Sequence, residues 1–294
     1  ICKNESSIST TLLVTFKFFP FILQCTTVFI STLFKRLHYN NTTPNRNQFT
    51  VFIFLNFYYY FYTMEKRIRD KFIDFVEGYV QEDRKNKFKK VLEERTKYIT
   101  VVIEDPVRSQ NASAVVRTCD CFGIQNTHII ENEHNYIINP LVLKGANQWV
   151  NIHKYNKKEN NTLDCLNKLK SEGYRIVATS PHANDVDLDE LDITKGKIAL
   201  IMGNEREGIS DIVREQADEF IKIPMVGFSE SFNISVSTAI CLNHITTQLR
   251  KSSIDYHLTE EEKEELFADW CLKSTNIPHK TEHEFYRRNP ELAP

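Results

Sequence analysis

The sequence predicts an α/β protein built on a parallel sheet that is flanked by helices. Residues 198–202 (IALIM) form a short, continuous apolar run, which is typical of a strand buried on both faces of a parallel sheet. Gly203 and Gly208 bracket the polar turn that follows, so the backbone there can approach a ligand closely. The same order recurs at 221–225, where a strand closed by a proline precedes a Ser- and Asn-rich loop and an apolar helix from about Ser235.

The part of the chain that follows Met64 predicts helix first, and then two strands around a second helix. Residues 64–97 carry two apolar stripes at helical spacing. Core strands are expected at 98–104 and 126–131, and a helix that is capped at its start is expected between them at 111–121. This alternation of strand and helix is the pattern of an α/β fold.

The middle and the end of the chain continue the pattern. A helix is expected at 160–173, followed by a strand at 174–179 that ends at the edge where open α/β sheets bind ligands. The acidic segment 185–192 is expected to be a structural loop. A last amphipathic helix is expected at 258–273, with Thr259 as its cap, before a polar tail.

Composition and cysteine usage narrow the function classes. The formal net charge of -2 and a sequence pI ≈ 6.6 argue against a uniformly basic nucleic-acid binder, but they allow a local basic patch. The seven cysteines are scattered and odd in number, and Cys119-x-Cys121 has no second pair and no histidine at zinc spacing. We interpret the cysteines as reduced thiols of a cytosolic protein and predict no metal, with a C-x-C metal half-site as the alternative.

Residues 1–63 differ in composition from the rest of the chain. The segment is crowded with Phe, Ile, Thr, Asn and Tyr, lacks clean helical or strand periodicity, and precedes the first methionine, Met64. We interpret it as translated upstream sequence of an A/T-rich genome, disordered, with Met64 as the true start. An organelle transit peptide and a membrane anchor at 18–34 stay open as alternatives. The predicted location is the cytoplasm, or an organelle if residues 1–63 are native.

Three motifs in the chain resemble those of one enzyme family. GNEREGI at 203–209 and IPM-x-G-x-x-x-SFNISVSTA at 223–239 resemble the second and third signature motifs of the SpoU/TrmH branch of the SPOUT RNA methyltransferases. PVRSQNASAVVRTCDCFG at 106–123 resembles the N-x-x-A-x-x-R-T-x-x-x-x-G element that comes first in that family. The motifs occur in the right order, and the resemblance covers about residues 85–250.

The resemblance implies a fold, a cofactor and a reaction. Its fold is a knotted α/β domain, in which the C-terminal stretch forms a deep trefoil knot that binds S-adenosylmethionine. Family members are homodimers with the site near the subunit interface, and their methyl transfer needs no metal. The implied reaction is 2′-O-methylation of a ribose in tRNA, at guanosine 18 of the D-loop, because the pattern is closest to the tRNA guanosine 2′-O-methyltransferases. One departure is Gln110, where many members of that group have a histidine.

Residue by residue, the resemblance assigns a cofactor pocket and a catalytic set. The adenosine pocket would be lined, largely through backbone groups, by Thr179, Gly203, Ile223 and Phe232. Arg117 would contact the target ribose–phosphate and help to activate the 2′-hydroxyl. The side chains that would position Arg117 and the RNA are those of Asn111, Glu205, Ser231 and Asn233.

The neighbours of Arg117 give a separate expectation. Val115, Val116, Cys119 and Phe122 are apolar, and this places Arg117 in a largely buried helix, where an arginine needs a partner. Because the pKa of a guanidinium lies above ~12, we expect Arg117 to act as an electrostatic clamp on the developing alkoxide. Proton abstraction by a transiently neutral arginine is the alternative.

A basic run lies in the predicted N-terminal helical region. On composition alone it would be a solvated helix face, but the resemblance implies a helix near the RNA whose cations contact phosphates without reading sequence. The residues concerned are Arg84, Lys85, Lys87, Lys89 and Lys90.

The predicted organisation after residue 63 is a basic helical region at 64–97, a methyltransferase domain at 98–250 and a helical extension at 251–294. The region at 64–97 is too short for a separate RNA-binding domain, which favours a tRNA substrate. Two alternatives remain for the function: a ribosomal RNA 2′-O-methyltransferase, and a catalytically silent RNA-binding protein on the same fold.

Overall fold

The computed structural model describes residues 66–180, 186–275 and 277–292. The interpretations of residues 1–63 lie outside the described residues. Two compact units are present, one formed by residues 76–276 and the other, in its described part, by residues 66–75 together with 277–292.

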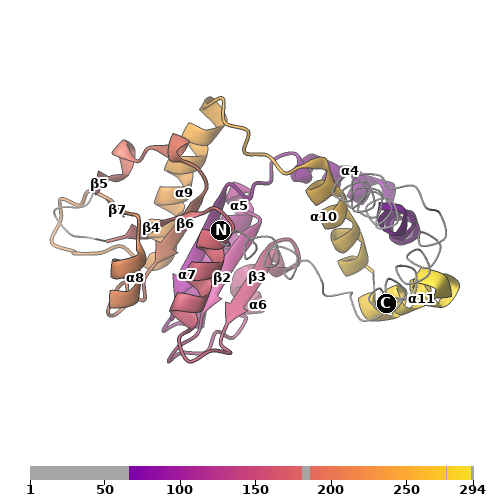
Figure 1. Cartoon of the computed structure of the whole chain (residues 1–294), viewed down its shortest axis with the longest axis horizontal. Coiled ribbons are helices and arrows are strands. Elements are labelled where there is room, and N and C mark those ends of the chain that lie inside the picture. Colours follow the sequence, from indigo (N-terminus) through magenta and orange to yellow (C-terminus); the bar gives the residue numbers. More distant parts are fainter. Residues whose placement is uncertain (1–65, 181–185, 276, 293–294) are drawn as a thin grey trace, which may run out of the picture. The chain divides into compact units, whose positions relative to one another are not determined.

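A seven-stranded, all-parallel sheet forms the centre of the larger unit (Figure 1). Its strand order is β3-β2-β1-β6-β4-β7-β5, so β6 pairs with both β1 and β4. The strands are β1 (Ile99–Glu104), β2 (Asn126–Ile130), β3 (Asn151–Tyr155), β4 (Arg175–Thr179), β5 (Val186–Asp187), β6 (Ile198–Met202) and β7 (Glu219–Lys222). Because all strands are parallel, their carboxyl ends meet at one edge and their amino ends at the other.

Helices connect the strands and cover both faces of the sheet, as the strand patterns predict. The larger unit contains α4 (Glu82–Leu92), α5 (Ser109–Phe122), α6 (Pro140–Leu143), α7 (Asn161–Ser171), α8 (Asp211–Gln216), α9 (Ile234–Lys251) and α10 (Glu260–Lys273). One apolar core lies between the sheet and α5 with α9, and the other lies between the sheet and α7 with α8. Strand β1 serves both cores, since Val101 and Ile103 face the first and Val102 faces the second.

Several helix ends are fixed by the capping residues that the sequence predicts. The side chain of Asn233 accepts a hydrogen bond from the backbone N–H of Ser235 and so caps α9. Thr259 and Glu262 form a reciprocal capping box at the start of α10. The positive φ of Gly173, at 83°, allows the sharp turn from α7 into β4.

Four predicted boundaries were wrong. Helix α5 begins two residues before Asn111, so Asn111 lies inside its first turn and does not cap it. Strand β7 ends at Lys222, before the proline that was expected to close it, and the expected acidic loop contains the short strand β5. The expected polar tail contains a helix, α11 (Pro278–Arg288). The trefoil knot stays a prediction.

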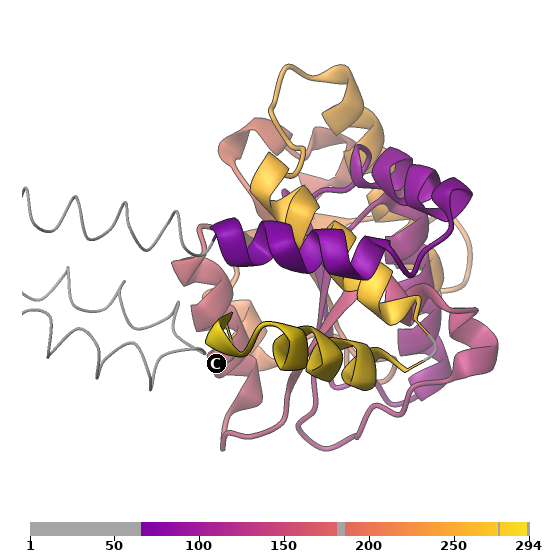
Figure 2. The ribbon, with the colours of Figure 1, turned by 90° about the vertical axis from the view of Figure 1, so that its right-hand side faces the viewer.

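Helices α4 and α10 pack against each other in the larger unit (Figures 1 and 2). Their contact centres on Trp270, which is buried and forms edge-on ring pairs with Phe88 and Trp149 at centroid distances of 5.7 Å. The guanidinium of Arg95 lies 5.3 Å from the Trp270 ring and forms an ion pair with Asp120 of α5. Trp149 is therefore half-buried among aromatic rings.

The smaller unit is held by aromatic contacts of its own. Residues 66–75 are helical, and the rings of Phe72 and Phe75 pack on Phe285 of α11 at centroid distances of 5.0 Å and 5.5 Å. Lys71 and Glu291 form an ion pair at 3.7 Å.

The described cysteines are free thiols, and Cys121 is the one among them that is exposed. Within the residues placed by the structure, no helix combines the length and the apolar character needed to cross a membrane.

Candidate active site

A cavity of about 450 Å³ opens at the carboxyl edge of the sheet. It is framed by the ends of β4, β6 and β7 and by the loops that follow β6 and β7. All four residues predicted to hold the cofactor line it, namely Thr179, Gly203, Ile223 and Phe232. Four of the five residues predicted for catalysis line it too, namely Asn111, Glu205, Ser231 and Asn233.

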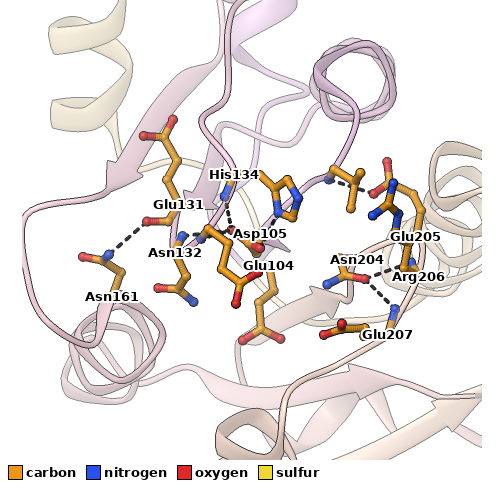
Figure 3. Close-up of polar contacts among 12 residues, drawn as sticks. Glu104, Asp105, Glu131, Asn132, His134, Asn161, Asn204, Glu205, Arg206 and Glu207 are labelled. Carbon is orange, nitrogen blue, oxygen red and sulfur yellow. Dashed lines mark hydrogen bonds and ion pairs between the residues drawn. The ribbon is translucent and has the colours of Figure 1, made fainter.

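The wall next to Gly203 is made of backbone alone. A Cβ atom on Gly203 would lie 2.2 Å from the carbonyl carbon of Gly208, closer than any real contact. The turn between them folds back because the backbone N–H groups of Asn204 and Gly208 each donate to the other's carbonyl, at 2.9 Å and 3.2 Å. Within the turn, the Asn204 side chain accepts hydrogen bonds from the N–H groups of Arg206 and Glu207 (Figure 3).

A chain of hydrogen bonds joins the three sequence motifs at the mouth of the cavity. One carboxylate oxygen of Glu205 accepts from the amide of Asn111 at 2.8 Å, and the other accepts from the backbone N–H of Val107 at 2.9 Å. Asn233 in turn donates to the side-chain oxygen of Asn111 at 3.3 Å. Residues more than 90 positions apart in the sequence are thus held in one polar cluster.

Arg117 lies outside this cluster, and the prediction that it is buried was wrong. It lies six positions after Asn111, a rise of roughly 9 Å along α5. Its side chain is exposed, it does not line the cavity, and its one hydrogen bond in the described part of the chain is a long one of 3.5 Å to the Val142 carbonyl. The buried face of α5 is formed by Val115, Val116 and Cys119, and Arg117 points away from it.

Glu104 is a buried carboxylate that the sequence analysis did not single out. It ends β1 and is 3% exposed. Its oxygens accept hydrogen bonds from the Thr162 hydroxyl at 2.8 Å and from the backbone N–H and hydroxyl of Ser210 at 2.9 Å and 2.7 Å. Glu104 therefore holds the far end of the loop that begins at Gly203. The available signal was a carboxylate that closes an otherwise apolar strand.

Asp105 fixes the loop that follows β2 (Figure 3). One of its oxygens accepts from the backbone N–H groups of Asn132, Glu133 and His134 at 2.8–2.9 Å, and the other contacts His134 Nδ1 at 2.7 Å. Burial alone would raise the pKa of the Asp105 carboxyl, but the hydrogen bonds from these three residues outweigh it and lower the pKa.

Asp105, Glu133 and His134 are also the one described group of three whose possible metal-ligand atoms lie within 4.8 Å of one another. Both Asp105 oxygens already accept hydrogen bonds from protein groups, and Glu133 is exposed. We therefore interpret the group as an anchor for the loop.

The cavity fits the S-adenosylmethionine that the resemblance implies. Its volume is in the range of small-molecule sites, and its apolar lining, which includes Ile221, Ile223 and Met202, suits an adenine ring. The Thr179 hydroxyl is already bonded to the Ile201 carbonyl at 3.0 Å, and no side chain fits at position 203. At positions 179 and 203, backbone groups are therefore what the chain offers a ligand.

The predicted RNA-binding residues differ in their surroundings on α4. Lys85 forms an ion pair with Glu82 at 2.7 Å, and a hydrogen bond from Lys85 lowers the pKa of Glu82. Arg84 lies over the rings of Phe88 and Trp149, and Lys89 lies over Phe267. The remaining two, Lys87 and Lys90, are exposed and form no ion pair within the described residues.

Comparisons with known proteins agree with this geometry. Residues 98–243 match the model of the SpoU rRNA Methylase family. The chain is 42% identical over 196 residues to the tRNA (guanosine(18)-2'-O)-methyltransferase of Borreliella burgdorferi, covering 67% of this chain and 88% of that protein. It is 34% identical over 201 residues to the protein of the same name from Aquifex aeolicus, covering 67% of this chain and 93% of that protein.

Among solved structures, the chain resembles the A. aeolicus TrmH/SpoU tRNA modifying enzyme. The two share 31% sequence identity and a TM-score of 0.60, over 66% of this chain and 98% of the other.

Proposed function

The chain belongs to the SpoU rRNA methylase family, and on this premise we propose that it methylates the ribose 2′-hydroxyl of guanosine 18 in tRNA. The observation that carries the proposal is the hydrogen-bond chain Glu205–Asn111–Asn233, which brings the three sequence motifs together at one cavity. The names of the two curated relatives supply the substrate and the position. The cofactor is S-adenosylmethionine, which supplies a methyl group on a sulfonium that is already a good leaving group.

We propose that residues in the walls of the cavity bind the cofactor. We assign the adenosine to Thr179, Gly203, Ile223 and Phe232, with Gly203 admitting it by the absence of a side chain. Glu230 also lines the cavity and offers a carboxylate to a positively charged ligand. Phe232 remains 43% exposed, so this part of the cavity wall is accessible to solvent.

We propose that the polar cluster at the mouth of the cavity positions the RNA. Glu205 and Asn233 fix the amide plane of Asn111, so that Asn111 is held in one orientation before the substrate arrives. Ser231 lies on the same rim and has its hydroxyl available to an RNA phosphate or ribose. Such pre-orientation favours an in-line approach of the 2′-hydroxyl to a bound methyl donor.

Arg117 is proposed to stabilise the developing negative charge on the ribose oxygen. A guanidinium is a poor base, so its role is electrostatic and it aids loss of the proton without accepting it. Because Arg117 does not line the cavity of its own chain, we propose that it reaches the cavity of a second copy.

The second copy is supported by apolar side chains exposed near α5. Ile137, just before α6, is 72% exposed, and Leu141, within α6, is 78% exposed; Val226 and Phe228 are fully exposed in the loop before α9. Both α6 and α9 pack against α5, which carries Arg117. Exposed apolar groups around one helix are typical of a subunit interface, so we propose a symmetric homodimer.

The RNA backbone is proposed to contact α4. Lys87 and Lys90 form no ion pair with any described residue, whereas Arg84 and Lys89 lie over aromatic rings and are still exposed. These cations bind phosphates without reading base sequence. We propose that residues 98–250 form the methyltransferase domain, with the segments 64–97 and 251–294 as helical extensions.

The test is a methyl-transfer assay with labelled S-adenosylmethionine and unmodified tRNA, followed by nuclease mapping. Label at guanosine 18 in an alkali-resistant dinucleotide is the expected result. Label on ribosomal RNA and not on tRNA would replace the substrate and keep the chemistry. Cofactor and RNA binding without label would favour a silent RNA-binding protein, and absence of cofactor binding would overturn the enzyme.

A further inference from the structure

A second cavity, of about 460 Å³, lies at the amino edge of the sheet, opposite the candidate active site. We call it the amino-edge cavity. The residues that line it include Lys97, Lys168, Lys197, Asn126, His128 and His153. Lys197 directly precedes β6, Lys97 lies two residues before the start of β1, and Asn126 begins β2, so the parallel arrangement of the strands brings the three residues together. No residue of this cavity lines the candidate active site.

The charges around the amino-edge cavity do not cancel. Two carboxylates face it, and each is matched by a lysine: Glu262 is 3.0 Å from Lys97, and Glu172 is 3.9 Å from Lys168. The second oxygen of Glu262 accepts the Thr259 backbone N–H, so Glu262 also belongs to the α10 capping box. Lys197 has no carboxylate within ion-pair distance in the described parts of the chain, and its ammonium lies 5.4 Å from the Tyr174 ring centroid.

Two imidazoles form part of the cavity wall. His128 and His153 stack with ring centroids 4.8 Å apart, and His128 Nδ1 is 3.1 Å from the Tyr155 hydroxyl. Burial, with the nearby His153 and Lys168, lowers the pKa of His128 to about 3, and burial with Lys168 and Lys97 lowers the pKa of His153. Both rings are therefore neutral near pH 7, and each presents one N–H donor without a charge of its own.

Some of these donors have no protein acceptor. The His153 imidazole makes no side-chain hydrogen bond to any residue that the structure describes, although it lines the cavity. The side-chain oxygen of Asn126 accepts from Asn151 at 3.1 Å, which leaves the Asn126 amide N–H groups available. A concave site with an uncompensated ammonium and several unused N–H donors lacks an acceptor, and an oxyanion is what supplies one.

We propose that the amino-edge cavity binds a phosphate group, held by Lys197 and by the N–H donors of His153 and Asn126. A phosphate suits the site because it offers several acceptor oxygens and at least one negative charge to a lysine and to neutral donors. The phosphate can come from a free anion such as pyrophosphate or from an RNA backbone, and both sources present the same chemistry. The proposal stands apart from methyl transfer, because it needs neither cofactor nor reaction.

The test uses the full chain and pyrophosphate as the probe, at constant ionic strength and without S-adenosylmethionine. Calorimetry measures affinity, and the side-chain nitrogen signals of His128 and His153 report location. Lys197→Met should weaken pyrophosphate binding about tenfold, as expected for loss of one charge-assisted hydrogen bond. Lys195→Met is the matched control, since Lys195 lies two residues away, is exposed and pairs loosely with Glu219 at 3.9 Å.

Each outcome decides the proposal. Pyrophosphate binding that shifts both histidine signals, and that weakens in Lys197→Met but not in Lys195→Met, supports it. Competition between pyrophosphate and unmodified tRNA would then identify RNA as the source, and binding of both at once would identify a free anion. Absence of binding, unshifted histidine signals or equal losses in the two variants would overturn the phosphate site.

Discussion

Among single residues, the candidate active site has its strictest requirement at Gly203, where there is no space for a side chain. A side chain there would collide with the backbone of Gly208 and Ile209, at 2.2 Å and 2.4 Å, and backbone cannot move as a flexible side chain can. We expect Gly203→Ala to push the 203–208 turn outward and to weaken S-adenosylmethionine binding by about tenfold or more, as measured by calorimetry, because close backbone approach is lost.

Gly227→Ala is the matched control for this variant. Gly227 lies in the loop before α9, and a Cβ atom there would meet nothing within 4 Å. Unchanged cofactor affinity in Gly203→Ala would show that the turn does not form the wall of the cofactor site.

Asp105 gives a pH dependence of stability whose sign follows from its hydrogen bonds. Its pKa is lowered in the folded chain, so the unfolded chain takes up a proton first as the pH falls. The stabilisation is therefore complete above the ordinary aspartate pKa of about 4 and is lost as the pH falls through the lower folded value. Asp105→Asn keeps an acceptor for the loop and tolerates the φ of 45°, but it removes the charge.

Urea unfolding of the two proteins from neutral pH to pH 3 measures the effect. The wild type should be more stable near neutrality by about 2 kcal/mol, the contribution of hydrogen bonds to a charged group. That difference should shrink as the pH falls below about 4. Asp189→Asn, at an exposed carboxylate without hydrogen bonds in the described chain, should show little difference at any pH. A constant difference for Asp105→Asn would contradict a charge-based anchor.

For single residues, the sequence was a better guide to which side chains meet at the cavity than to the position of Arg117. Asn111, Glu205 and Asn233 belong to motifs whose geometry is fixed by the fold, and all three were found together. For Arg117 the inference used its neighbours in sequence, although residues one or two positions apart on a helix face different directions. The buried stripe of α5, which includes Val115 and Cys119, leaves position 117 on the opposite side.

At the scale of single elements, α4 carries lysines that we expect to differ in how much they contribute to tRNA binding. Lys87 and Lys90 are exposed without ion pairs to described residues, whereas Lys85 is only 16% exposed and is paired with Glu82. We expect Lys87→Ala and Lys90→Ala each to lower tRNA affinity and to reduce the slope of log affinity against log salt by about one unit.

Lys85→Ala is the control on the same helix, and its slope should change little, because its charge is already matched by Glu82. Filter binding over a series of salt concentrations measures all three slopes. Equal slopes in all variants would place the RNA on another surface.

Element boundaries were predictable where a local signal fixes them. Asn233 caps α9 and Thr259 caps α10, and these side-chain bonds depend on neighbouring residues alone. The start of β7 at Glu219 is set by pairing with β4, and β5 exists because two residues at 186–187 pair with β7. Such pairings join residues that are distant in sequence, so no local sequence pattern predicts them.

For the whole molecule, the fold separates Arg117 from the candidate active site of its own chain. The cavity, the polar cluster and Gly203 occupy the carboxyl edge of the sheet, while Arg117 projects from α5 beside exposed apolar groups. If a symmetric partner covers those groups, each Arg117 can serve the cavity of the other subunit, and two equivalent sites result.

Complementation between two impaired variants, assayed with S-adenosylmethionine below saturation, tests this arrangement. Arg117→Ala should lower methyl transfer about a hundredfold by removing a positive charge from beside the developing oxyanion, and Gly203→Ala should weaken cofactor binding about tenfold or more. The two variants are co-expressed with different tags, and the mixed dimer is isolated through both. When Arg117 acts across the interface, one of the two sites combines an intact cavity with an intact arginine, so the mixed dimer should recover about half of wild-type activity. If Arg117 served its own chain, both sites of the mixed dimer would carry a defect, and activity would stay at the level of the single variants.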